Sequence, residues 1–341
     1  MIRIGINARS RLSISSSISL SLSLCSLLLV SAVAASANTT DSIDQATDLH
    51  LELKSRTSAL GQELNQLSSE LHPTDLLLAE PHMDLAHANQ SLGNHAEAIN
   101  GFEKALHIYR INHGLFDLRQ LTVVENLLVS HYALGRWEDI DNLQHLRFHL
   151  AKQQIPPGAE TRLSALMGLT MWKLHAAEND LLANPLAAAH EVAELHRKEL
   201  ELLSADAPAD SLAMHHLGIA DMELTLARQK VRAPFAMGLD SGMPLTTLGL
   251  HGNIRLVDDN SSSSSLVESF DQLPHTGKER LDVFHISRHL HEYKSSLSKA
   301  HSLSHQAAEH SPHRHEVLEQ SIKRSIDNYN GFVAKVVLGR F

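Results

Sequence analysis

A pattern of residues that recurs at an interval of 42 positions constrains the fold of this chain more than any other feature of its sequence. In each copy, apolar residues at helical spacing lead to a glycine, and a second helical pattern follows. Glycine ends a helix readily because it adopts positive φ without steric cost. Each copy therefore predicts two helices and a tight turn, and such short pairs must stack to bury enough apolar surface. The matching positions are Asp75-Leu76, Leu85, Leu92-Gly93 and Glu97, then Asp117-Leu118, Leu127, Leu134-Gly135 and Asp139.

The turn and second helix of the first copy carry a family resemblance. Residues 92–99 read LGNHAEAI and residues 102–106 read FEKAL. This run resembles a tetratricopeptide repeat, with Ala98, Phe102 and Ala105 at the family's small, large and small packing positions. The 42-residue interval resembles the longer variant of that repeat. The resemblance implies an all-α fold, an α-solenoid of antiparallel helix pairs.

The later copies depart from the family pattern. The second copy keeps the Leu134-Gly135 turn but has polar residues at the large and second small packing positions. A third copy places Leu169 on a helix of about residues 159–177, followed by a helix from Pro185 to Leu203. The organisation that we predict is a signal peptide (1–37), an N-terminal capping helix (38–74), helical repeats (75–231), a low-complexity linker (232–278) and His-rich and amphipathic C-terminal helices (279–341).

The first 37 residues have the order of charged, apolar and small residues that is typical of a secretory signal peptide. Cleavage after Ala37 would give a periplasmic or secreted protein without a stable membrane span. An uncleaved anchor is the first alternative. A lipoprotein with a lipidated Cys25 is the second, although Leu24 stands where a small residue is needed.

Composition favours some function classes and excludes others. A hydrophobic content of 43% with only 4% aromatic residues suits packed helices. A net charge of −10 without a basic stripe makes nucleic acid a poor partner. Cys25 is the only cysteine, so thiolate sites and disulfides are excluded after cleavage. We find no G-x-S-x-G, no phosphate-binding loop and no H-E-x-x-H, and we predict no enzyme and no cofactor.

Histidine is unusually frequent, with 25 residues in the chain. Pairs four residues apart place two imidazoles on one helical face, which is a spacing that metal sites use. No ligand set completes any pair in the sequence, so we assign no metal ligands. A solvated His-rich face, a metal-binding segment and a pH-responsive charge remain open as alternatives. The pairs are His145/His149, His285/His289 and His301/His305.

The resemblance also implies a binding surface, because the first helix of each repeat lines the concave face in that family. A surface with thioether and few charged groups suits an extended or helical peptide. We therefore expect a protein or peptide partner. The amphipathic C-terminal helix could bury its apolar face on the solenoid, on its open face or against a second subunit, which leaves a homo-oligomer open. The predicted partner-binding residues are Met83, His87, Gln90, Glu125, Val129, Tyr132, Met167 and Met171.

Overall fold

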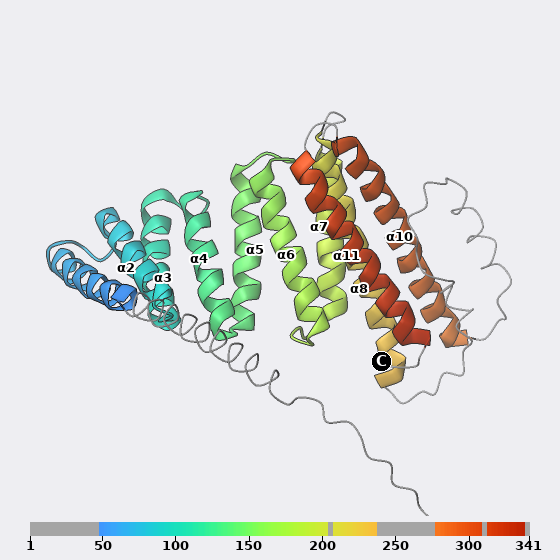
Figure 1. Cartoon of the computed structure of the whole chain (residues 1–341), viewed down its shortest axis with the longest axis horizontal. Helices are drawn as coiled ribbons and strands as arrows, with labels where there is room; N and C mark the ends of the chain where they lie inside the picture. The colour runs from blue at the N-terminus through green and yellow to red at the C-terminus, as the bar shows by residue number, and fades with distance from the viewer. Residues whose placement is uncertain (1–47, 204–206, 237–276, 309–311, 338–341) are drawn as a thin grey trace, which may run out of the picture.

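The computed structural model of the chain describes residues 48–203, 207–236, 277–308 and 312–337. Within these ranges the chain is built from helices and connecting turns, with no strand (Figure 1). The all-α prediction is therefore confirmed. The predicted signal peptide with Cys25, and residues 237–276 of the predicted linker (232–278), lie outside the described residues. The two ends of that predicted linker, residues 232–236 and 277–278, are helical instead.

The helices follow one another with short connections through most of the described chain. A helix over residues 48–70 precedes the 3-10 turn η1 (Leu76–Leu78). The remaining elements are α2 (Ala79–Ser91), α3 (His95–His113), α4 (Arg119–Leu134), α5 (Trp137–Gln154), α6 (Glu160–Glu178), α7 (Pro185–Leu202), α8 (Ala209–Ala236), α10 (Gly277–Ala308) and α11 (Pro312–Val337).

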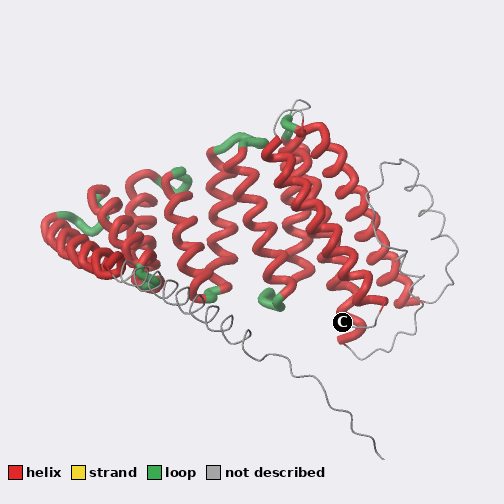
Figure 2. The backbone as a smooth tube through the Cα atoms, viewed as in Figure 1, coloured by secondary structure: helices red, strands yellow, loops and turns green. Residues whose placement is uncertain are grey.

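Helices α2 to α7 form a row in which each helix packs against the next one along the chain. The connecting loops alternate between the two ends of the row, so neighbouring helices are antiparallel (Figure 2). One core of buried aliphatic and aromatic side chains runs through this row. Ala98, Phe102 and Ala105 are completely buried in or beside it, as the packing pattern of the first copy predicts.

The turns of the row confirm the roles that the sequence gives to the glycines. Gly93 and Gly135 have φ of 79° and 64°, values at which a residue with Cβ is strained. The third copy has Ala177 at the equivalent position, and there α6 continues to Glu178. Asp180, with φ of 55°, then turns the chain. An aspartate can take this conformation because its short polar side chain tolerates it.

The predicted capping segment packs on the beginning of the row. Leu64 and Leu67 of the helix over residues 48–70 contact Leu78, Ala79 and Ile108 in a small separate core. The leucines at the start of this helix are not buried in that core; Leu49, for example, is exposed. Residues 38–47 of this predicted segment are outside the described ranges.

Helices α8, α10 and α11 form a second group at the other end of the row (Figure 1). α10 lies along α8, and α11 packs against both. The amphipathic face that the sequence predicts on the last helix is buried here, including Ile322, Tyr329 and Phe332. The C-terminal helix therefore buries its apolar face within its own chain. α8 also continues to Ala236, past the predicted repeat boundary at Val231.

No helix in the described residues carries an apolar stretch long enough to cross a lipid bilayer.

Candidate peptide-binding face

The predicted partner-binding residues lie on α2, α4 and α6, the first helices of the three helix pairs. These helices are neighbours in space as well as alternate elements in the sequence. Gln90 of α2 reaches α4, and the ring of Tyr132 on α4 lies 6.0 Å from that of Trp172 on α6. The eight residues are therefore brought onto adjacent helices, but their surroundings differ from helix to helix.

The three residues on α2 are engaged in packing inside the chain. Met83 is partly buried against the core of the row. The His87 ring meets Phe102 edge-on, with 5.1 Å between the ring centroids. The Gln90 amide donates hydrogen bonds of 2.9 Å to the Asn126 carbonyl and the Ser130 hydroxyl. These side chains hold α2 to its neighbours and present little surface to a partner.

The predicted residues on α4 are the most accessible of the set. Val129 is 54% exposed and Tyr132 is 40% exposed, although the opposite side of α4 is buried. Glu125 is also exposed, and its carboxylate lies 2.9 Å from the guanidinium of Arg147 on α5. Val129 and Tyr132 thus form an exposed apolar strip on α4, with the ion pair of Glu125 and Arg147 beside it.

Four rings gather at one end of α4, α5 and α6. Trp137 and Trp172 are stacked with their centroids 6.1 Å apart, and Tyr132 meets Trp172 edge-on. The His175 ring lies 6.1 Å from both tryptophan rings. We call Tyr132, Trp137, Trp172 and His175 the ring cluster; it holds both tryptophans of the chain. The sequence analysis missed three of its members, although the scarcity of tryptophan was a signal.

The ring cluster has a buried base and an exposed rim. Trp172 is buried, and its indole N–H donates a hydrogen bond of 2.5 Å to Asp141, which also pairs with Lys173 at 2.7 Å. Burial alone would raise the pKa of Asp141, but the bonds from Lys173 and Trp172 hold it below its usual value. Trp137, by contrast, is 37% exposed. The ring cluster is therefore held in place by the hydrogen bond of Trp172 and by ring stacking, while Trp137 remains accessible.

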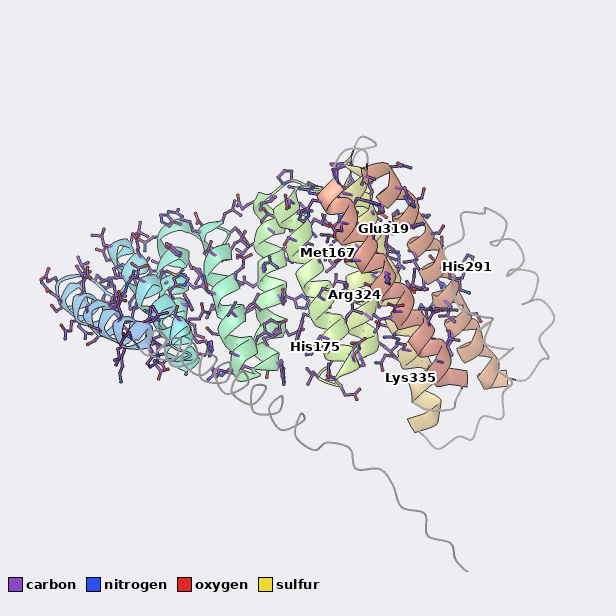
Figure 3. The ribbon with its side chains drawn as sticks, viewed as in Figure 1. Met167, His175, His291, Glu319, Arg324 and Lys335 are labelled. Carbon is purple, nitrogen blue, oxygen red and sulfur yellow. The ribbon has the colours of Figure 1, made fainter. Side chains whose placement is uncertain are left out.

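The predicted residues on α6 lie beside α11. Met167 is partly buried, whereas Met171 is exposed and its Sδ is 3.4 Å from the Arg324 guanidinium of α11. Arg314 of α11 also pairs with Glu160 at the start of α6. Figure 3 marks the two helices by Met167 and Arg324. The chain's own C-terminal helix thus borders the face at α6, while the part on α4 stays open.

A polar contact replaces part of the apolar packing between α5 and α6. Gln144 is buried where the family has a large apolar residue, and Arg147 bonds to the Ser164 hydroxyl as well as to Glu125. A Cβ on Gly168 of α6 would stand only 2.6 Å from the Arg147 guanidinium. Gly168 on the neighbouring helix therefore leaves room for Arg147, the polar residue that the second copy has at a small packing position.

The three histidine pairs have different surroundings. His145 faces the carboxylates of Asp141 and Glu191 at 3.8 and 3.9 Å, whereas His149 contacts the ring of Phe116. The His289 imidazole bonds to Glu223 at 2.6 Å. Within the described residues, only His301 and His305 belong together to a group of three candidate ligand residues, and the third residue, Glu319, comes from another helix.

Two shallow depressions, each of about 540 Å³, lie away from the ring cluster. One is lined by the connection between α3 and α4, from His113 to Arg119. The other lies between the helix over residues 48–70, α2 and α3, and includes His82 and His107. Burial is the largest cause that lowers the pKa of His82, with the charge of Lys104 as the second.

Comparison of the sequence with protein-family models finds no match, and comparison with curated proteins finds none either. The tetratricopeptide resemblance accordingly remains a resemblance of sequence pattern. A functional proposal must therefore start from the geometry of the described residues. The feature used below is the exposed apolar strip of α4 together with the ring cluster.

Proposed function

We propose that this chain is an exported, non-catalytic interaction protein that binds a peptide or protein segment on its concave face, along the exposed side of α4. The observation that carries the proposal is the exposure of Val129 and Tyr132 next to the ring cluster. Exposed apolar side chains that lie together and are rimmed by polar groups are a mark of interaction surfaces, whereas single ones are common on any protein. Aromatic side chains at a surface are also the residues that most often anchor a protein partner.

The physical basis of binding would be burial of apolar partner side chains on a surface that is already ordered. The rings of Tyr132 and Trp137 pack on Trp172, so binding costs them little conformational entropy. The ion pair of Glu125 and Arg147 at the edge of the strip offers polar groups that would fix the register of a bound chain. Because α11 borders the face at Met171, a partner would lie mainly over α4.

The compartment and the family assignment belong to the same proposal. The residue pattern of positions 1–37 supports export to the periplasm or the outside of the cell. The helix pairs with glycine turns support a tetratricopeptide-like solenoid as the framework. Neither depends on the identity of the partner.

A crosslinked pull-down from the cell envelope tests the proposal. The bait is the full chain with a tag that lacks histidine, and the altered bait carries Val129→Asp and Tyr132→Asp. We expect one or a few partners that the altered bait loses. The matched control is Ile111→Asp on α3, because Ile111 is as exposed as Val129, at 53%, but lies on another helix.

Tryptophan fluorescence supplies a second readout with the purified partner. Both tryptophans are in the ring cluster, so a segment that binds there should change the intrinsic emission of the chain. If the bait with Val129→Asp and Tyr132→Asp captures the same proteins as the Ile111→Asp control, α4 is not the binding surface. The same conclusion follows if binding of the partner leaves the tryptophan emission unchanged.

A further inference from the structure

A group of three metal-ligating side chains joins α10 to α11. His301 and His305 lie one helical turn apart on α10, and Glu319 faces them from α11. One ligand atom of each can be chosen so that all three lie within 4.8 Å of one another. In the part of the chain that the structure describes, this is the only such group of three or more histidine, cysteine or acidic residues.

The distances within this group suit a small metal ion. The two Nε2 atoms of His301 and His305 are 3.2 Å apart. Two nitrogen ligands of a tetrahedral zinc ion, each at about 2.0–2.1 Å from the metal, lie about 3.3 Å from each other. The Nδ1 atom of His301 is buried and makes no hydrogen bond, although Oε1 of Glu319 is 3.6 Å away. The two side chains thus face each other without a completed contact.

The surrounding residues orient this group as outer residues of metal sites do. The Ser304 hydroxyl donates a hydrogen bond of 2.9 Å to Oε1 of Glu319. The Nδ1 atom of His315 lies 3.0 Å from the same hydroxyl and 3.1 Å from the Ser304 carbonyl oxygen. Because the hydroxyl proton goes to Glu319 and the carbonyl can only accept, an Nδ1–H on His315 satisfies these contacts. In the neutral ring, Nε2 of His315 then keeps its lone pair. Hydrogen bonds of this kind fix the orientation and tautomer of ligands.

His315 lies beside this group and would have to move closer to act as a fourth ligand, since it is not among the three residues whose ligand atoms lie within 4.8 Å of one another. It lies one turn before Glu319 on α11, and its ring centroid is 6.0 Å from that of His305. Two helices that each present a pair of ligand residues four positions apart can supply a complete tetrahedral set. His305 is exposed, so an ion could enter from solvent without unfolding the helices.

We propose that His301, His305 and Glu319 bind one divalent transition-metal ion, for which Zn²⁺ is the probe, with His315 or a water molecule in the fourth position. Two imidazoles and one carboxylate are a ligand set that zinc accepts. The bound ion ties α11 to α10. Since Arg314 and Arg324 of the same helix contact Glu160 and Met171 on α6, the ion also holds α11 beside the face at α6.

Zinc titration of the untagged full chain tests this site. A weak competing chelator suppresses binding at the many other histidines, so that one tight equivalent per chain is measured. We expect His301→Gln and Glu319→Gln each to abolish that equivalent. Ser304→Ala should weaken it about tenfold, because it removes an orienting bond rather than a ligand. The matched control is His291→Gln, an exposed histidine on the same helix (Figure 3).

Thermal unfolding with and without zinc distinguishes a lost ligand from a lost fold. The original chain and His291→Gln should melt at a higher temperature with zinc, whereas His301→Gln and Glu319→Gln should melt at the same temperature in both conditions. Tight binding that survives in Glu319→Gln and His301→Gln overturns the proposal. So does the absence of a tight equivalent in the original chain.

Discussion

The row of α2 to α7 and the group of α8, α10 and α11 are both helical, but they are held together differently. In the row, each helix packs on the next one along the chain, and the core is aliphatic and aromatic. In the C-terminal group, α10 packs along α8 across an interval of some forty residues in the sequence. The row is thus assembled from local contacts, and the C-terminal group from distant ones.

The two regions also differ in the polar groups that they bury. Asp221 of α8 accepts a hydrogen bond of 2.6 Å from the Ser325 hydroxyl of α11, and the Tyr293 hydroxyl of α10 donates to the Ser325 carbonyl at 3.0 Å. Burial raises the pKa of Asp221 to about 6. The row buries polar groups of another kind, as in the ion pair of Arg162 on α6 and Glu199 on α7 at 2.7 Å. The C-terminal packing should therefore lose stability as Asp221 gives up its proton at rising pH.

Removal of α10 and α11 tests how far the two regions depend on each other, and we expect the largest effect from it. A chain that ends at Val231 exposes Leu217, Leu224 and Val231 itself, all buried in the intact protein. We expect this chain to aggregate or to lose helical content, because an apolar surface of this size is not stable in water. Light scattering and circular dichroism measure the outcome. A monomeric shortened chain with an unchanged melting temperature would show that the row is independent.

Phe102→Ala tests the apolar core of the row. Phe102 is completely buried, so its truncation should lower the free energy of unfolding by about 3–5 kcal/mol. The loss should be equal at pH 5 and pH 8, since the deleted ring carries no proton. Chemical denaturation measures it. Leu115→Ala is the control, because Leu115 is 64% exposed and should change the stability by less than about 0.5 kcal/mol.

Asp221→Asn should change the stability less than the truncation at Val231 or Phe102→Ala does. Unlike the effect of Phe102→Ala, its effect should depend on pH. The raised pKa means that the folded chain binds this proton more tightly than the unfolded chain does. The contribution of Asp221 to the free energy of unfolding therefore falls as the pH rises from 3.8 to about 6. Asn keeps an acceptor for Ser325 without the charge, so the variant should be more stable by about 2–3 kcal/mol at pH 7.

The same variant should be close to neutral below pH 4, where Asp221 is protonated in both states. Denaturation at a series of pH values gives the profile. Asp327→Asn is the matched control, because Asp327 is an exposed aspartate on α11. A stability difference that does not change with pH would remove the contrast between the two regions.

The sequence alone determined the local structure of the row. The glycine positions predicted the turns at Gly93 and Gly135, and the pattern around Phe102 predicted its burial. The predicted helices of the third copy differ from α6 and α7 by one residue at their ends. These features depend on neighbours within a few positions, and residue periodicity reports such neighbours directly.

Only the tertiary structure decided which predicted residues stay open and which groups meet. Gln90 and Tyr132 hold equivalent places in the 42-residue repeat, yet the first is bonded to α4 and the second is exposed. The meeting of Trp137 with Trp172, and of Glu319 with His301, joins residues on different helices. Such contacts depend on how whole helices are oriented and in which register they pack. A pattern along one helix does not contain that information.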